Sequence, residues 1–191
     1  MTGPTRDPWT DVRTRHGYDA DEVISSLQKA IRRGQLEEAT LLAYEMYCTS
    51  AELEEYLWAR LQVISAEDVG TGTWREPVVV DALYRMHQRI DRSTGDRFLF
   101  AVHAVRLLVT ATKDRTSDEL ANWARHSVES GERPPQIPDH ALDMHTRRGQ
   151  EMGRDELHFL RVAATVENEI PDRDLTWRNW LLEHAQSTDE Q

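Results

Sequence analysis

Apolar residues recur every three or four positions along most of the chain, a spacing that places them on one face of an α-helix. The first such stripe runs from Val23 to Ile31, and Gly34 follows it where a helix would end. Similar stripes predict further helices over 36–47, 53–64, 77–86, 95–112, 116–131, 155–169 and 175–184, with a short helix and loop over 143–153. No alternating pattern typical of a β-strand competes with them. We therefore expect an all-α, single-domain bundle of about seven to nine helices.

Interruptions of the stripes set the expected domain limits. They predict a flexible N-terminal segment at 1–17, a helical domain at 18–170, and a C-terminal helix with a frayed tail at 171–191. Within the domain, residues 132–139 hold three prolines and are expected to be extended, because proline denies the backbone both a donor and helical angles. Thr49 and Thr116 are each followed three residues later by a glutamate, which is the capping-box spacing at a helix start.

Charge and composition narrow the possible partners. The 191 residues include 34 acidic and 23 basic side chains, so the chain as a whole repels phosphate backbones and anionic lipids. Any contact with nucleic acid must therefore be made by a local basic patch. The single cysteine excludes an internal disulfide, and no apolar run approaches the roughly 20 residues of a membrane span. We expect a cytoplasmic protein without membrane contact.

The motifs of the common nucleotide-binding and hydrolytic enzymes are absent from the sequence. A phosphate-binding loop needs glycine directly before its lysine, whereas Gln28 precedes Lys29 and Thr112 precedes Lys113. Neither GxGxxG nor GxSxG occurs. We therefore assign no catalytic residue and no cofactor, and expect no nucleotide hydrolysis by this route.

Histidine spacing gives no support for a metal site. His140 and His145 lie close together after the prolines, but their separation matches no standard helical ligand pair. His103 lies in the apolar stripe at 95–112 and is expected to be a core residue, as is Cys48. The sequence thus predicts no metal ligand.

Three polar segments stand at predicted helix ends: "SAEDVG" at 65–70, "TKDRTSDE" at 112–119 and "HTRRGQEMGR" at 145–154. Two interpretations stay open. The segments either interlock as structural salt bridges, or they line one pocket for an anion, a nucleotide or a phosphate backbone. The candidate residues of this polar or anion-binding site are Lys29, Glu67, Asp68, Lys113, His145, Arg147 and Arg148.

Two further groups are candidates for contact with other molecules. Arg147, Arg148 and Arg154 form the basic patch that would bind DNA. Trp177 and Trp180 lie on neighbouring faces of the last predicted helix and are candidates for an intermolecular interface, although packing back onto the bundle is an equal alternative.

Residues 17–160 resemble the C-terminal region of the MgsA/RarA-type replication-associated recombination ATPases, relatives of the clamp loaders. The first predicted helix matches that family's signature at Tyr18, Asp19, Ser25, Lys29, Ile31 and Arg32. "SAEDVG" is similar to the family's "SEDxG" motif, and "IPDHALDMHTRRGQEMG" is similar to its proline-led ending. The resemblance implies an all-helical, self-associating collar, which in that family lies behind an ATPase motor and serves replication and repair at stalled forks.

This chain lacks the motor, so the family's ATP-dependent activity does not carry over. The expected function is a non-catalytic oligomerisation or adaptor module, forming a homo-oligomer and binding a separately encoded ATPase or another replication or repair protein. The alternative is an enzyme of unknown chemistry, or an anion- or nucleotide-binding protein. In that case Glu67 or Asp68 would act as general base, while His145, Arg147 and Arg148 would hold the substrate.

Overall fold

The computed structural model describes residues 7–189, with side chains up to residue 186. Over this range it contains nine α-helices and no β-strand, and the only bridge pairs Arg13 with Asp19. The predicted all-α class is therefore confirmed. Within the same range, none of the helices has the length and apolar character needed to cross a membrane.

The chain divides after Glu129 into two compact units. The first contains α1 (Ala20–Arg32), α2 (Leu36–Thr49), α3 (Ala51–Ile64), α4 (Glu76–His87), α5 (Asp96–Thr110) and α6 (Thr116–Glu129). The second contains α7 (Arg147–Glu151), α8 (Glu156–His158) and α9 (Thr176–Asp189). The sequence had predicted one domain across residues 18–170, whereas the division falls just before the segment rich in proline.

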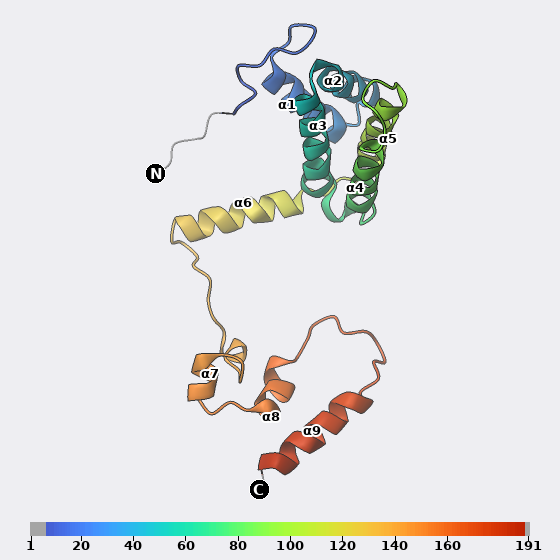
Figure 1. Ribbon diagram of the computed structural model, residues 1–191. Coiled ribbons are helices and arrows are strands. Elements are labelled where there is room, and N and C mark those ends of the chain that lie inside the picture. The colour runs from blue at the N-terminus through green and yellow to red at the C-terminus, as the bar shows by residue number, and fades with distance from the viewer. Residues whose placement is uncertain (1–6, 190–191) are drawn as a thin grey trace. The chain divides into compact units, whose positions relative to one another are not determined.

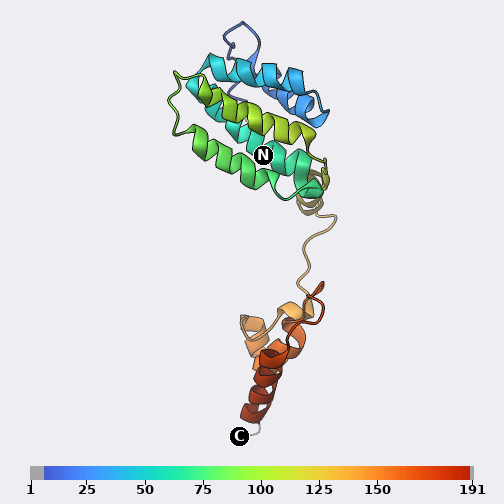
Figure 2. The same ribbon diagram turned by 90° about the vertical axis from the view of Figure 1, so that its right-hand side faces the viewer.

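The first five helices form the main core (Figures 1 and 2). α1 packs against α2, α2 packs against α3 and α5, and α4 packs against α5. The apolar stripe of α1 is buried as its spacing predicts, and Trp58 and Leu57 of α3 lie at the centre with almost no exposed surface. Each fully buried leucine contributes roughly 1.5–3 kcal/mol relative to an exposed one, so this unit carries its own stable core.

Residues 7–17, expected to be a flexible lead-in, lie against this bundle. The Trp9 ring packs on Tyr56, with ring centroids 5.1 Å apart, and Thr14 is buried. The Thr14 amide donates to the Tyr18 carbonyl at 2.9 Å, which closes a turn at Gly17. Local periodicity cannot reveal such a segment because it is built from turns and is held to the bundle by tertiary contacts such as that of Trp9 with Tyr56. Residues 1–6, the rest of the expected lead-in, are outside the described range.

Other details differ from the sequence expectations. The α3 cap is Ser50, whose hydroxyl accepts from the Leu53 amide, and Thr49 instead ends α2. His103 is exposed on α5 and not in the core, since the buried positions of α5 are Ala101, Ala104, Val105, Leu108 and Val109. Cys48 is only half-buried.

The segment after α3 contains the first of the three polar segments, at 65–70. "SAEDV" forms a π-helical turn, Ser65–Val69, followed by a 3-10 turn, Gly70–Gly72. Gly70 has φ of +51°, and a Cβ atom at this position would lie 2.3 Å from the Asp114 carbonyl oxygen. Glycine is therefore required here by both the backbone angle and the close approach of the chain that leads into α6.

The second unit has a small core. Leu142, Leu160 and Ala185 are its buried apolar residues among those described. α8 continues as a π-helical segment, Phe159–Ala163, and packs with it against α9. The predicted helix over 155–169 ends early, at Ala163, and the apolar residues Val166 and Ile170 beyond it are exposed, so no packing surface supports a longer helix.

Candidate functional site

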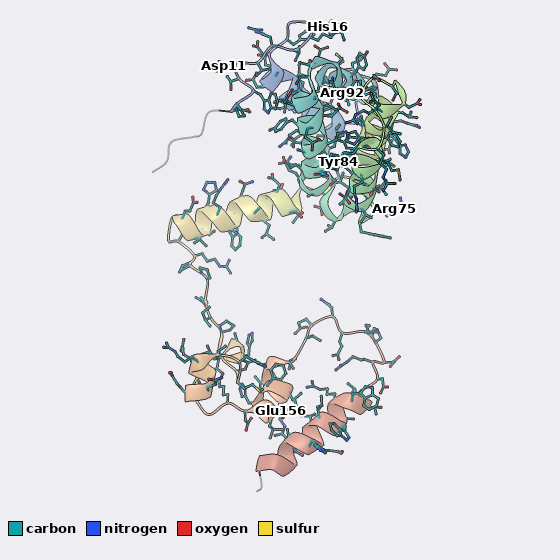
Figure 3. The ribbon with its side chains drawn as sticks, in the orientation of Figure 1. Asp11, His16, Arg75, Tyr84, Arg92 and Glu156 are labelled. Atoms are coloured by element: carbon teal, nitrogen blue, oxygen red, sulfur yellow. The ribbon has the colours of Figure 1, made fainter. Side chains whose placement is uncertain are left out.

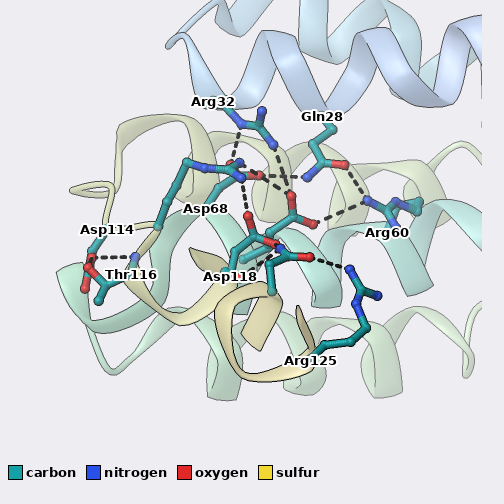
Figure 4. Close-up of polar contacts among 11 residues, drawn as sticks. Gln28, Arg32, Arg60, Asp68, Asp114, Thr116, Asp118 and Arg125 are labelled. Carbon is teal, nitrogen blue, oxygen red and sulfur yellow. Dashed lines mark hydrogen bonds and ion pairs between the residues drawn. The ribbon is translucent and has the colours of Figure 1, made fainter. Parts of the chain in front are cut away.

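Two of the three polar segments meet at the start of α6 (Figure 4). The Asp114 amide donates to the Asp68 carbonyl at 3.0 Å, and the Thr71 hydroxyl donates to the Asp114 carboxylate. Arg115 crosses from the start of α6 to the carboxylates of the π-helical turn. The structure thus brings residues 65–71 and 114–118 into one network, as the sequence predicted for these two segments.

Asp68 is the centre of this network and is fully buried. Its Oδ1 accepts from Arg32 Nε and from Arg115 Nη1, the latter at 2.9 Å, and its Oδ2 accepts from Gln28 Nε2 at 3.0 Å. A carboxylate is buried at low cost only when it is paired and hydrogen-bonded, and both oxygens meet that condition here. Asp68 therefore has no free oxygen with which to take a proton from a substrate.

Glu67 occupies the outer side of the network, with its side chain 24% exposed. Its Oε1 lies 3.1 Å from Arg32 Nη2 and 3.5 Å from Arg115 Nη1, and its Oε2 lies 3.9 Å from Arg60 Nη2. Arg60 also donates to Gln28, while its Nε is buried without an acceptor among residues 7–189. Glu67 is thus shared by three guanidinium groups.

Charge in the network is balanced. Three arginines, Arg32, Arg60 and Arg115, face Glu67, Asp68 and the Asp118 carboxylate, which also pairs with Arg115. Burial alone would lower the pKa of Arg115, but its hydrogen bond to Asp68 and the neighbouring carboxylates raise it. The network holds its cations firmly and offers no excess positive charge to an added anion.

The two lysines predicted for this site make other contacts. Lys113 Nζ donates to the carbonyl oxygens of Leu108, Val109 and Ala111, where it caps the end of α5. Burial lowers the pKa of Lys113, and the charge of Asp68 opposes this shift. Lys29 donates to Ser25 one helical turn earlier. Among the described residues, the cations that pair with Glu67 and Asp68 are instead Arg32, Arg60 and Arg115.

The third polar segment belongs to the second unit. Arg147 is exposed, with Glu151 as its partner at 3.7 Å, and Arg148 is also exposed. His145 pairs with Asp143 at 3.2 Å and meets the Phe159 ring edge-on. The juxtaposition of these residues with Glu67 and Asp68 stays a prediction.

Arg154 differs from the other arginines of this segment. Its guanidinium donates to the carbonyl oxygens of Asp139 and Leu142 and pairs with the Asp139 carboxylate at 2.6 Å. These contacts fasten the turn before α7 and leave its side chain mostly buried. Of the three predicted DNA contacts, only Arg147 and Arg148 are accessible within their own unit.

The tryptophans of α9 are both exposed. Trp177 has 74% of its surface accessible, and the Trp180 ring stacks on His184 with centroids 4.1 Å apart. Large exposed aromatic side chains are typical of contact surfaces between proteins. Their role as an interface stays a prediction.

A second buried charge network, which the sequence did not predict, lies between α3 and α5. Glu54 is buried and pairs with Arg92 at 2.7 Å and with Arg97 at 2.6 Å. His87 stacks on Trp58, and its Nε2 lies 3.7 Å from Glu54. Desolvation lowers the pKa of His87, and the charge of Arg97 adds to this effect. Glu54 and His87 lie inside the bundle and Arg92 reaches them from its partly exposed edge, so we assign this network to stabilising the fold.

Sequence reasoning missed several members of the Asp68 network. Gln28 and Arg60 contribute polar contacts from the exposed-looking faces of α1 and α3. The available signal was weak: Gln28 and Arg32 are four residues apart and so share a helix face next to the buried stripe. That spacing shows that the two residues share a helix face, but it does not show which residues that face contacts.

No protein-family model matches the chain, and no curated protein matches it.

Proposed function

We propose that this chain is a non-catalytic helical module that self-associates and so organises a partner, in the manner of the collar of replication and recombination ATPases. The observation that carries the proposal is the apolar face of α6. Leu120 is 58% exposed and Val128 is 51% exposed, and Trp123 between them is about half exposed. Leu120 and Trp123, three residues apart, share one side of the helix, and Val128 lies about 80° around the axis from Leu120.

The attachment of α6 to its unit supports this interpretation. The helix packs against the π-helical and 3-10 turns at its beginning, and from there it runs away from the five-helix core (Figure 1). Ser127 is its only buried residue. An α-helix of 14 residues is roughly 21 Å long. Most of that length is therefore available to pack against another chain.

The Asp68 network supports a structural role over the enzymatic alternative. General-base catalysis needs a carboxylate within hydrogen-bond reach of a substrate proton. The oxygens of Asp68 are occupied by Arg32, Arg115 and Gln28, and those of Glu67 by three arginines. The network instead fastens the beginning of α6 to α1 and to the π-helical turn.

Self-association is the simplest use of the α6 face. An exposed apolar surface of leucine, tryptophan and valine can pack against the same surface of a second copy, as a two-fold interface requires. The acidic net charge of the chain disfavours nucleic acid as the occupant of this face. A separately encoded replication or repair protein would then bind the assembled module, as the family resemblance implies.

The test is the native mass of the full chain by sedimentation equilibrium over a wide concentration range. The wild-type protein is expected to associate, and Leu120→Glu to weaken association. Burying one leucine contributes roughly 2 kcal/mol, and a two-fold interface counts it twice, so the dissociation constant is expected to rise by at least about 100-fold.

Leu99→Glu is the matched control, since Leu99 is a similarly exposed leucine on α5, at 64%. This variant should retain the wild-type association. A wild-type protein that stays monomeric at the highest concentration would reject the proposal. So would equal effects of the two substitutions.

A further inference from the structure

The loop that precedes α1 brings a histidine to the end of α2. His16 lies at its tip (Figure 3), beside Glu45 and Cys48 in the last turns of α2. His16 Nδ1 lies 2.6 Å from Glu45 Oε2, and the side-chain ligand atoms of the three residues all lie within 4.8 Å of one another. A nitrogen, an oxygen and a sulfur ligand thus converge at one point.

The spacing on α2 suits a shared ligand. Glu45 and Cys48 are three residues apart, so their side chains lie on the same face of the helix, one turn from each other. Glu45 is almost completely buried although it belongs to a surface helix, and Cys48 is half-buried beside it. The third ligand comes from a segment almost thirty positions earlier in the chain, as its separation of 29 residues from Glu45 shows.

The loop is held in place before any ligand binds. The His16 amide donates to Glu45 Oε1 at 3.0 Å, and the Arg15 amide donates to Thr49 Oγ1 at 3.0 Å. Gly17 has φ of +88°, which only glycine adopts readily, and its amide donates to the Thr14 carbonyl at 2.9 Å. The position of the histidine relative to α2 is therefore fixed by backbone contacts and not by its ring alone.

We propose that His16, Glu45 and Cys48 bind a divalent transition metal of the zinc type. Imidazole, carboxylate and thiolate are the ligands that zinc prefers in proteins, and three protein ligands leave the fourth tetrahedral position open. A glutamate and a thiolate together neutralise the two charges of the ion. A tetrahedral zinc holds its ligand atoms roughly 3.3–3.6 Å apart, so only small side-chain movements are needed to close the site.

The open position has access to a pocket. His16 and Glu45 line a cavity of about 570 Å³ between the loop, α1 and α2, together with Tyr18, Glu22 and Glu38. Its further carboxylates and the phenol are suited to a water molecule or a basic ligand on the metal. The site therefore resembles the open arrangement of three protein ligands more than a closed structural one.

The protonation of the ligands is consistent with metal binding. Burial opposes the ionisation of Glu45, yet hydrogen bonds from Thr14 and His16 lower its pKa, so the carboxylate is charged. Burial and the charge of Glu45 raise the pKa of Cys48, while Arg15 and Arg92 lower it to a smaller extent. The thiol therefore carries a proton in the metal-free protein, and binding of the ion releases it to solvent as the thiolate forms.

A metal-free alternative makes a different prediction. The His16–Glu45 pair is by itself a clasp that joins the loop to α2, and Cys48 then acts as a small packing residue. The clasp requires neither the sulfur nor a metal. Participation of Cys48 in a spectroscopic signal therefore separates the two explanations.

The experiment titrates the reduced full chain with Co²⁺ under anaerobic conditions and follows the absorption spectrum. A metal bound by Cys48 gives a thiolate-to-cobalt charge-transfer band in the near ultraviolet, together with intense visible bands of tetrahedral Co²⁺. Added Zn²⁺ should displace the cobalt and remove both. Cys48→Ser is expected to lack the charge-transfer band, and His16→Asn to weaken cobalt binding by at least about tenfold.

His103→Asn is the matched control, because His103 is an exposed histidine elsewhere in the same unit. This variant should bind cobalt like the wild-type protein. The proposal is overturned if the wild-type chain shows no charge-transfer band with excess Co²⁺. It is also overturned if the band survives Cys48→Ser, or if His16→Asn binds as tightly as the control. Circular dichroism of each variant confirms that the helices are retained.

Discussion

Replacing Asp68 by asparagine tests whether the polar network fastens α6. The substitution keeps the volume and one acceptor but removes the charge that faces Arg32 and Arg115. It also turns an amide donor toward Gln28 Nε2, which itself donates, while Gln28 Oε1 is already occupied by Arg60. Two donors then face each other in a buried position.

The expected loss of stability follows from the burial of Asp68. Removing one partner of a fully buried ion pair costs about 3–5 kcal/mol, and Asp68 has no exposed surface. The two arginines keep about a third of their side chains in water, at 33% and 31%, so solvent compensates part of the loss. We therefore expect the lower end, about 3 kcal/mol. With a urea slope of about 2 kcal/mol/M, the midpoint should fall by about 1.5 M.

The assay is urea unfolding at neutral pH, followed by circular dichroism and tryptophan fluorescence. Glu67→Gln serves as the control, because Glu67 is partly exposed and its pairs are longer, so it should cost no more than about 1 kcal/mol. A loss below about 0.5 kcal/mol for Asp68→Asn would refute the view that the network is a stabilising anchor.

Three further predictions concern pH and backbone packing. Hydrogen bonds from Thr116 and Thr71 lower the pKa of Asp114 from 3.8 to about 2. The contribution of Asp114 to the free energy of unfolding is therefore present above pH 3.8 and lost as the pH falls toward 2. The difference in stability between wild type and Asp114→Asn, measured from urea midpoints, should shrink over that window. His87 has a pKa below its ordinary 6.5, so the unfolded chain binds a proton at a higher pH than the folded chain does. The stability of the fold should therefore decline as the pH falls below 6.5. Thermal unfolding of His87→Gln should lack this decline. At Gly149 an added Cβ would lie 1.9 Å from the Asp143 carbonyl oxygen, so Gly149→Ala should cost about 3 kcal/mol or more, whereas Gly95→Ala, into open space, should be nearly neutral by calorimetry.

Helix positions were largely predictable because the signal for them is local. The stripe from Val23 to Ile31 predicted α1, and the structure buries those residues over Ala20–Arg32. Boundaries were less predictable: Thr49 has the capping-box spacing to Glu52, whereas the observed cap is its neighbour Ser50, which is followed three residues later by Leu53. Only the backbone angles of the formed helix select Ser50.

The polar site was predictable in part. The two segments that meet, at 65–70 and 112–119, were identified because each lies at a helix end, where unpaired backbone groups and charged residues gather. Gln28 lies within α1 and Arg32 at its end, and periodicity marks both only as polar. Which polar face of a helix meets a distant carboxylate depends on how helices pack, and the sequence carries no local signal for that. The same holds for His16, Glu45 and Cys48.

The Asp68 network, which fastens the beginning of α6, also affects the proposed association through α6. Apolar contacts are not directional, whereas the bonds from Arg115 and Asp114 to the π-helical turn fix the direction in which α6 leaves the core. A helix held in its binding orientation loses less conformational freedom on association. Asp68→Asn should therefore weaken self-association even though Asp68, being fully buried, lies outside any interface. Sedimentation equilibrium at a temperature where the variant remains folded measures this effect, and an unchanged dissociation constant would show that the anchor and the interface are independent.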